Sequence, residues 1–354
     1  MSTPKFANAP ASFHAELKRR INQYFETTGK KSTGNKALYS KAIILTVAFL
    51  ALYVHLVFFT PGAVWAILEC ILLGGVVAGI GFNIMHDGAH GSFSRRPWVN
   101  SLAAFSLNVL GGSHFMWNVK HNVIHHAYTN IDGVDDDIDI QPWMRMSSTQ
   151  PKYVIHRWQH RYFWGLYALL YILWIFVLDY QKYFKRKVGG LPLKKMGISD
   201  HIVFWAFKVL HLFLFIVLPI YTVGFVAWLI GFLIFTLVAG FVLSIVFQLA
   251  HTVEHTHFPM PDEASGRLQD EWAVHQLKTT ANFAPQNKII NWLVGGLNFQ
   301  VEHHLFPKIS HIHYPAISKI IREACAEFDV PYIVYPKMRY AVASHVAYLK
   351  QMGR

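Results

Sequence analysis

Histidine is the residue type in this sequence whose spacing points most directly to chemistry. Of 21 histidines in 354 residues, seven fall in three short clusters: His86 and His90 in HDGAH, His121, His125 and His126 in HNVIHH, and His303 and His304 in QVEHH. A single loop histidine is usually solvated. Three clusters that each offer two or three imidazole nitrogens instead predict a metal site.

Spacing within the clusters favours ligands on helices. Residues four apart share one face of an α-helix, so His86 with His90, and His121 with His125, can each direct two imidazoles at one point. His126 is then expected to point in a neighbouring direction. In QVEHH, the side chains of Gln300, His303 and His304 repeat this one-face geometry at offsets of three and four.

The number of imidazoles indicates more than one metal ion. Seven nitrogen donors exceed what one ion needs, so we expect two ions. Zinc and copper also accept imidazole. Iron is preferred, because a nonhaem iron pair with O2 can break an unactivated C–H bond, which no side chain does unaided.

The composition predicts a membrane protein. The chain is 53% hydrophobic, and four apolar segments can span a bilayer, since 18 helical residues cover roughly 27 Å. We therefore expect an all-α integral membrane fold with four transmembrane helices in two hairpins and a cytosolic helical cap. The expected segments are residues 42–59, 63–85, 202–221 and 223–250.

The distribution of Lys and Arg predicts how the chain is oriented in the membrane. Lys and Arg lie away from the two short hairpin turns, which puts both termini and the catalytic face in the cytosol, at a bacterial inner membrane or the endoplasmic reticulum. The first residues lack the apolar core of a signal peptide. One domain, 1–354, is expected, divided into an N-terminal segment (1–40), a first hairpin (42–85), a cap with the first two clusters (86–200), a second hairpin (202–250) and a C-terminal part with the third (251–354).

Two weaker apolar stretches, 102–116 and 163–178, could be further crossings. The three clusters can share one site only if they emerge on the same side, so we interpret both stretches as interfacial or re-entrant helices. Within the spans, small residues around Gly75 and Gly79 predict close helix packing. Glu69, His55 and His211 are expected to pair or pack rather than function.

The motifs HDGAH, HNVIHH and QVEHH, in this order and separated by paired spans, resemble the three histidine boxes of the membrane fatty acid desaturases. The tract at 279–317 is similar to the front-end branch, whose third box begins with Gln. The resemblance covers most of the chain and implies an O2-dependent diiron acyl desaturase of delta-5 or delta-6 type. It implies eight iron ligands: His86, His90, His121, His125, His126, His251, His303 and His304.

The resemblance leaves the ligand set open at one position. Either the Gln300 amide holds a ligand or water, or His255, four residues after His251, completes the set. Asp87 and Glu302 stand beside box histidines, so each either accepts an imidazole N–H or is solvated at the surface.

Two motifs that this sequence lacks bear on the source of its electrons. The haem motif HPGG of the fused cytochrome b5 domain and a dinucleotide fingerprint are both missing, so we expect electrons from a separate protein of cytochrome b5 or ferredoxin type. The substrate is expected to be acyl-CoA or acyl-lipid. Arg95, Arg96 and Lys120 are candidates for binding it.

Remaining charges have plainer interpretations. Six basic residues are expected to contact lipid headgroups, namely Lys182, Lys185, Arg186, Lys187, Lys194 and Lys195. The acidic run 132–139 lacks the pattern of a calcium loop, so it is interpreted as a solvated, salt-bridged loop in preference to a docking site for a partner. The net charge of +12 flanks apolar segments, which excludes nucleic-acid binding.

Two rival functions remain. A membrane hydroxylase of an alkane, sterol or carotenoid could use similar boxes, and it would yield an alcohol. A metal transporter or metal-binding membrane protein would place its ligands at the bilayer midplane.

Overall fold

The computed structural model describes residues 4–7 and 12–354, which are mostly helical. The hairpins consist of α2 (Lys36–Val54), η1 (His55–Phe59), α3 (Ala63–Ile80), η2 (Gly81–Met85), α4 (His86–Ala89), α11 (Ile198–Leu212), η6 (Phe213–Val217), α12 (Leu218–Val223) and α13 (Phe225–His251). The central cap contains α5 (Pro97–Val109), α6 (His114–Asn118), η3 (Val119–His125), α7 (His126–Tyr128), η4 (Val154–Trp158), α8 (Gln159–Ala168), α9 (Leu170–Leu173), η5 (Trp174–Leu178) and α10 (Asp179–Lys185).

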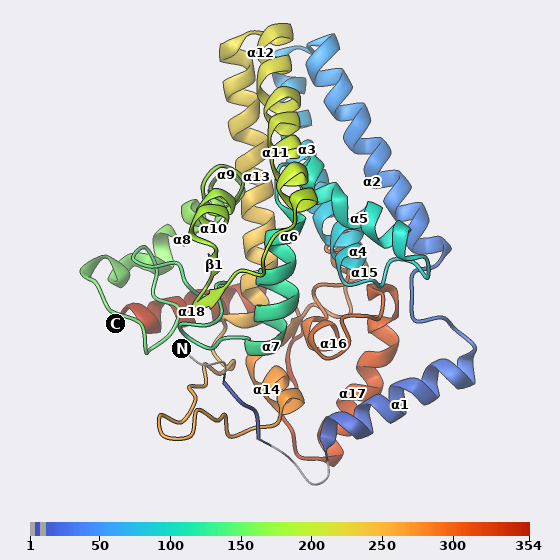
Figure 1. Ribbon diagram of the computed structural model, residues 1–354, viewed down its shortest axis with the longest axis vertical. Helices are drawn as coiled ribbons and strands as arrows, with labels where there is room; N and C mark the ends of the chain where they lie inside the picture. Colours follow the sequence, from blue (N-terminus) through green and yellow to red (C-terminus); the bar gives the residue numbers. More distant parts are fainter. Residues whose placement is uncertain (1–3, 8–11) are drawn as a thin grey trace.

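Helix α1 and the helices that follow α13 form the rest of the cap, on the side away from the hairpin turns (Figure 1). These helices are α1 (Phe13–Thr28), α14 (Trp272–Thr279), α15 (Lys288–Leu293), α16 (Gln300–Leu305), η7 (His311–His313), α17 (Tyr314–Glu327) and α18 (Met338–Gly353). Two short sheets accompany them. Strands β1 (Lys187–Val188) and β2 (Leu191–Pro192) are antiparallel, and β3 (Ala281–Phe283) and β4 (Ile333–Tyr335) are parallel.

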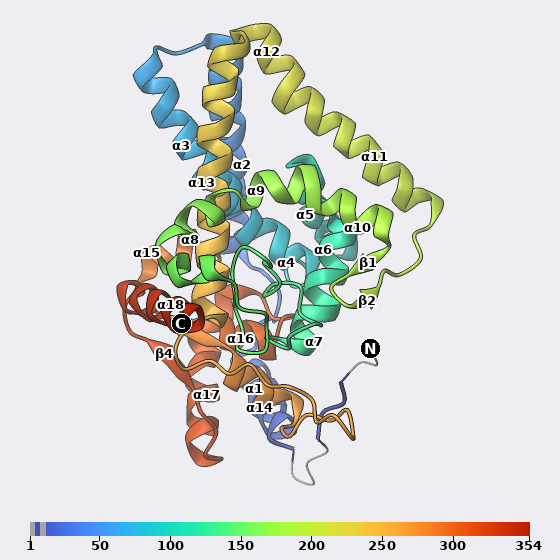
Figure 2. The same ribbon diagram turned by 90° about the vertical axis from the view of Figure 1, so that its left-hand side faces the viewer.

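Four helical segments among the described residues are long and apolar enough to cross a membrane: Lys36–Phe59, Ala63–Ala89, Ile198–Val223 and Phe225–His251. Their turns lie together at one end of the molecule (Figures 1 and 2). The prediction of four spans in two hairpins is therefore confirmed. The helices begin or end a few residues beyond the predicted bounds. For the first helix the reason is a cap, since Asn35 Oδ1 accepts the N–H of Ala37 at 2.9 Å.

Helices α3 and α13 approach each other closely because Gly74 has no side chain. A Cβ added at Gly74 would lie 2.5 Å from the carbonyl oxygen of Phe235, whereas one at Gly75 would meet open space. The predicted small-residue contact is thus made by Gly74, and Gly79 packs against Leu45 instead.

The stretch 163–178 lies in a bent helix pair, Val154–Ala168 with Leu170–Lys185, which turns by 59°. Its two ends contact the same polar loop. Gln159 Nε2 donates to Arg145 O at 3.0 Å, and Lys182 Nζ lies 2.9 Å from an Asp136 oxygen. The contact of both ends with one loop agrees with the predicted re-entrant arrangement of this pair. The other weak stretch forms the short helices α5 and α6.

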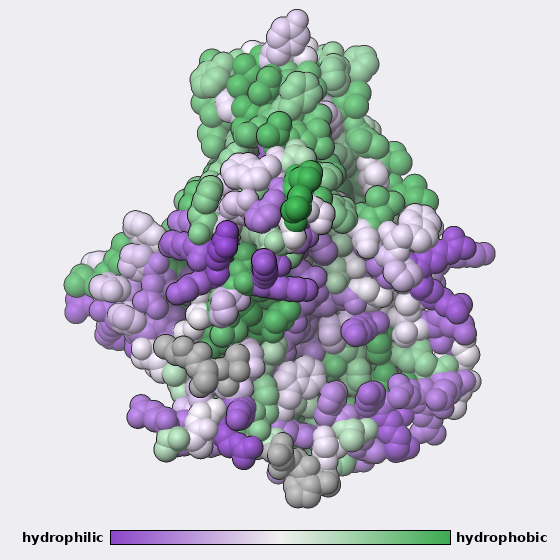
Figure 3. All heavy atoms as spheres, in the orientation of Figure 1, coloured by the Kyte–Doolittle hydropathy of each residue, from purple (hydrophilic) through white to green (hydrophobic). Residues whose placement is uncertain are grey.

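The surface divides into an apolar end and a polar end (Figure 3). Apolar residues surround the hairpins, and hydrophilic residues gather over the cap, which agrees with a membrane-embedded protein. Inside the first hairpin, Glu69 pairs with His55 Nδ1 at 2.9 Å. His211 stacks on Phe215 with ring centroids 4.5 Å apart. The predictions that these polar residues pair or pack are confirmed.

Candidate functional site

Histidines from four separate segments meet where the hairpins join the cap. His86 begins α4, and His90 follows its last residue. His251 ends the long helix α13, and His303 and His304 lie on the short helix α16. The second cluster connects η3 to α7. Each of these imidazoles is buried, with at most 9% of the residue exposed.

The second cluster adopts a π-helical turn, which changes the direction of one histidine. Val119–His125 is π-helical rather than α-helical. Because a π turn closes i to i+5 hydrogen bonds, it brings residues five apart close together. His126 Nε2 accordingly lies 3.2 Å from His121 Nε2. The two rings are perpendicular, and His126 joins a different group from His121, as expected of a histidine that points in a neighbouring direction.

The convergence produces groups of nitrogen atoms that could each hold a metal ion. Within a group, one atom from each residue lies within 4.8 Å of the others. The all-histidine groups are His86 with His90, His121 and His303; His125 with His251 and His304; and His126 with His303 and His304. His126 lies between the first two groups, its ring centroid 4.5 Å from those of both His303 and His304.

The inner nitrogens fit a metal because hydrogen bonds do not satisfy them. Five of the clustered histidines have a buried Nε2 without a hydrogen-bond partner in the described part of the chain: His90, His125, His251, His303 and His304. Outside the cluster, the same holds for His114, His211 and His275. Buried polar atoms without partners are rare in native proteins. A bound cation would account for the alignment of the five clustered atoms.

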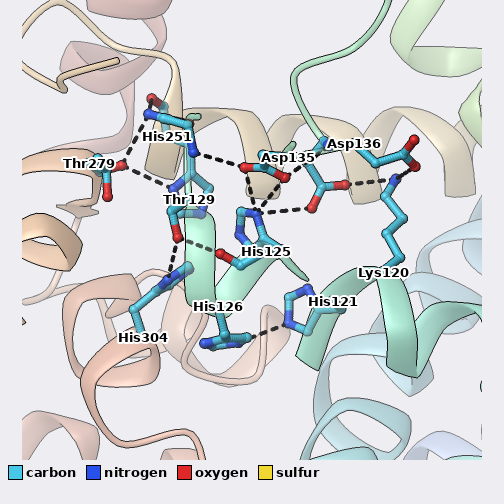
Figure 4. A network of polar contacts seen from close by, with 12 residues as sticks. Lys120, His121, His125, His126, Thr129, Asp135, Asp136, His251, Thr279 and His304 are labelled. Atoms are coloured by element: carbon cyan, nitrogen blue, oxygen red, sulfur yellow. Dashed lines mark hydrogen bonds and ion pairs between the residues drawn. The ribbon is translucent and has the colours of Figure 1, made fainter. Parts of the chain in front are cut away.

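Oxygen atoms hold the outer nitrogen, Nδ1, of four of these imidazoles. The contacts are Asp135 Oδ2 to His125 at 3.0 Å, the Thr279 carbonyl to His251 at 3.2 Å, Tyr314 Oη to His303 at 3.2 Å, and Gln276 Oε1 to His304 at 2.8 Å. Figure 4 shows the contacts of His125 and His251. An imidazole that donates from Nδ1 presents a lone pair at Nε2, so these contacts orient the rings inward.

Burial keeps most of these imidazoles neutral. It lowers the pKa of His126, His303 and His304 well below the usual histidine range, and neighbouring imidazoles lower it further. His125 differs. Burial opposes its charge, but the carboxylates of Asp135 and Asp137 outweigh burial and raise its pKa. Neutral imidazoles are the form that binds metal.

The acidic run is salt-bridged, and Asp139 in it is exposed, but Asp135 is buried. Asp135 is only 2% exposed and also accepts the N–H of Asn130 at 2.9 Å. Lys120 Nζ lies 2.8 Å from Asp137 and 3.4 Å from Asp136. Lys182 pairs with Asp136 and is buried, so its predicted contact with lipid headgroups is wrong. The other five basic residues of that group are exposed.

The two alternatives for completing the ligand set differ in position. Gln300 is 1% exposed, and its Nε2 is unpartnered among the described residues. His255 is exposed, stacks on Tyr335 with ring centroids 6.4 Å apart, and joins none of the histidine groups found in the described ranges. Burial beside the centre therefore favours Gln300.

Asp87 and Glu302 contact groups other than box imidazoles. The Asp87 carboxylate accepts Ser310 Oγ–H at 2.7 Å and lies 3.1 Å from His311 Nδ1. Glu302 accepts hydrogen bonds from Asn282 Nδ2 at 2.7 Å and Tyr332 Oη at 2.8 Å. Burial raises the pKa of the Glu302 carboxyl. Since their exposures are 1% and 0%, the surface-solvated alternative is wrong for both.

Among the substrate-binding candidates, Arg95 and Arg96 are exposed. Lys120 differs because its charge is neutralised by the acidic run. Sequence reasoning missed Gln276, Thr279 and Tyr314, which lie outside the boxes. A signal existed for α14, since the side chains of Trp272, Gln276 and Thr279 are spaced four and three apart and share a helix face.

Buried imidazoles gathered at the base of two membrane hairpins define an integral-membrane protein with a candidate metal centre. A family model described as "Fatty acid desaturase" matches residues 63–336. The chain belongs to the fatty acid desaturase family, and the predicted resemblance is confirmed.

Named relatives agree with this membership. The chain is 39% identical to the sn-1 linoleoyl-lipid 6-desaturase of Arthrospira platensis, over 96% of this chain and 92% of that protein. It is 36% identical to the Synechocystis sp. protein of the same name, over 97% and 96%. It is 33% identical to the acyl-lipid (8-3)-desaturase of Physcomitrium patens, over 99% of this chain and 74% of that protein.

Proposed function

We propose that this chain is a front-end acyl desaturase that introduces a cis double bond near the carboxyl end of a lipid-linked acyl chain, at the delta-5 or delta-6 position. The convergence of buried imidazoles beneath two membrane hairpins is the observation that carries this proposal. Relatives named as acyl-lipid desaturases support the lipid-linked substrate over acyl-CoA.

The proposed metal ligands divide into two sets. His86, His90, His121 and His303 form one, His125, His251 and His304 form the other, and His126 lies between them. Iron is the proposed metal, with Gln300 as a further ligand or as a residue that orients a ligand or water. Two irons with O2, reduced by a separate electron-transfer protein, would supply the oxidant that removes hydrogen from two neighbouring methylenes.

The protein's own residues prepare this centre before any metal binds. The contacts of Asp135, Thr279, Tyr314 and Gln276 fix ring orientation, so little reorganisation remains when the metal binds. Burial excludes bulk water from the site, which protects a strong oxidant from side reactions. Arg95 and Arg96 remain candidates for an anionic headgroup.

We place the histidine end and both termini in the cytosol, because the basic residues gather over the cap. Cysteine replacements at the exposed residues Arg157 and Lys185 test this arrangement. Both should react with an impermeant reagent from the cytosolic side alone. Labelling of the two from opposite sides would show that the bent helix pair crosses the membrane.

Expression in a host of known lipid profile tests the activity, with gas chromatography and double-bond mapping of the fatty acids. The wild type should yield a new cis double bond at carbon 5 or 6, together with two irons per purified chain. His126→Ala should abolish the product, whereas His255→Ala should retain it, because His255 lies outside the cluster. An alcohol product would indicate a hydroxylase, and an active preparation free of iron would overturn the proposed centre.

A further inference from the structure

Helix α14 (Trp272–Thr279) lies outside the three boxes but contacts the segments of the second and third boxes and the segment that carries His251. Trp272 Nε1 donates to the carbonyl oxygen of His126 at 3.1 Å. The carbonyl oxygen of Thr279 lies 3.2 Å from His251 Nδ1. In Figure 1 the helix lies just below α7 and beside α16, the helices that carry His126 and His304.

Two side chains on one face of this helix and one backbone carbonyl at its end make these contacts. Trp272 and Gln276 are four residues apart, so their side chains lie on one polar stripe of the helix, whereas Thr279 contributes its backbone carbonyl. On another side of the helix, Ala273 and Leu277 are fully buried in an apolar cluster with Leu17 and Ile317. Because that side is packed, the polar stripe is held in a fixed position against the histidines.

Gln276 lies on this stripe, one turn after Trp272. It is 1% exposed, and its Oε1 lies 2.8 Å from His304 Nδ1 and 2.9 Å from Thr129 Oγ1. With the Gln276 amide in this orientation, its oxygen accepts the hydrogen bond and His304 carries its proton on Nδ1. The lone pair of His304 is then on Nε2.

The Nε2 atom of His304 is the atom that would bind the metal ion. It is buried and has no hydrogen-bond partner in the described ranges. One nitrogen of His304 also lies within 4.8 Å of nitrogens from His125 and His251. The opposite tautomer would direct an N–H into this group and leave no lone pair there, so the hydrogen bond at Nδ1 decides whether His304 can act as a ligand.

We propose that Gln276 is a positioning residue that selects the Nδ1–H tautomer of His304 and so prepares its Nε2 to bind metal. The same helix also holds His251 through the Thr279 carbonyl and the backbone of His126 through Trp272. This inference rests on the metal centre of the proposed function and adds a residue to it from outside the boxes.

Metal binding by purified, metal-free protein tests the proposal without turnover. Bound iron per chain is measured anaerobically at graded Fe²⁺ concentrations for the wild type and for Gln276→Glu, Gln276→Leu and Lys278→Gln. Gln276→Glu keeps an acceptor oxygen and should bind both ions within a few-fold of wild type. Gln276→Leu should bind one of the two ions about 10- to 100-fold more weakly, the usual effect of removing such a partner, and leave the other unchanged.

Lys278→Gln is the matched control on the same helix. Its ammonium pairs with Asp270 at 2.7 Å and is partly exposed, away from the histidines. This variant should bind both ions like wild type. Thermal unfolding of each metal-free variant checks folding, and Gln276→Met, which keeps the side-chain length, replaces Gln276→Leu if that variant is unfolded.

Two outcomes overturn the inference. One is wild-type affinity for both ions in a folded Gln276→Leu or Gln276→Met protein. The other is an equal loss of affinity in Gln276→Glu and the apolar variant, because the acceptor oxygen would then be irrelevant. Failure of the wild type itself to bind iron would refute the proposed function instead, so the two failures are distinguishable.

Discussion

A buried ion pair at the base of the second hairpin allows a prediction whose magnitude follows from its geometry. Lys208 Nζ donates to Gly111 O at 2.7 Å, Ile175 O at 2.9 Å and Asp179 Oδ2 at 2.9 Å. All three of its N–H groups are therefore satisfied. The side chains of Lys208 and Asp179 are 5% and 1% exposed.

Replacing Lys208 with Met leaves the Asp179 carboxylate buried without its cation. The carboxylate keeps the N–H of Ser113 at 2.8 Å and Trp174 Nε1–H at 3.1 Å, but neither carries a full charge. Loss of one partner from a buried pair costs about 3–5 kcal/mol. Lys208→Met/Asp179→Asn removes both charges while the amide oxygen still accepts one of those two bonds, so it should be less destabilised than Lys208→Met alone.

The assay is unfolding of the purified protein in one detergent, analysed as a double-mutant cycle. A loss of about 3–5 kcal/mol changes the unfolding equilibrium constant roughly a hundred- to several thousand-fold. Lys185→Met, at an exposed position, is the control and should stay within about 0.5 kcal/mol of wild type. The reasoning is refuted if Lys208→Met costs less than about 1 kcal/mol, or if the double variant is as unstable as the sum of the single changes.

Three further predictions concern the histidine centre and the cap. Asp135→Asn should weaken binding of one iron about 10- to 100-fold in an Fe²⁺ titration, because the amide no longer holds the His125 Nδ1 proton as a carboxylate does. Asp132→Asn is the control and should leave iron binding unchanged, because the Asp132 carboxylate accepts hydrogen bonds from Thr149 and Gln150 and not from a histidine. Burial lowers the pKa of His345 to about 4. As pH falls, His345 is therefore protonated in the unfolded chain before it is protonated in the folded protein. The free energy of unfolding then decreases by on the order of 3 kcal/mol between about pH 6.5 and pH 4. His345→Gln should remove that share of the pH dependence in unfolding experiments, and an unchanged slope would contradict it. Chelation should lower the melting temperature and Fe²⁺ should restore it, since saturation at about 100 times the dissociation constant stabilises by about 2.7 kcal/mol. A melting temperature indifferent to chelation would contradict this.

Local patterns predicted much of the molecule. The four spans follow from hydropathy, because a lipid-facing helix must be apolar along its whole length. The boxes follow from residue type and spacing, since the one-face geometry of His86 and His90 needs only a helix. His251 came from family resemblance alone, as no spacing links it to the boxes.

The roles of charged and polar residues between these elements depended on tertiary structure. Lys182 was expected at lipid headgroups, yet it pairs with Asp136, 46 positions away along the chain. The acidic run was expected to be solvated, yet Asp135 is buried against His125. Sequence alone shows that such residues are charged, but their burial is decided by segments that pack over them.

The sequence by itself determined that this protein enters a membrane and gathers histidines at one end of its spans. Only the tertiary structure decided which histidines share a group, that a π turn brings His126 beside His121, and that Gln276 contacts His304. The physical reason is the range of the interactions. Helical periodicity and hydropathy act over a few residues, whereas the contacts of an imidazole's outer nitrogen come from segments that meet only when the chain has folded.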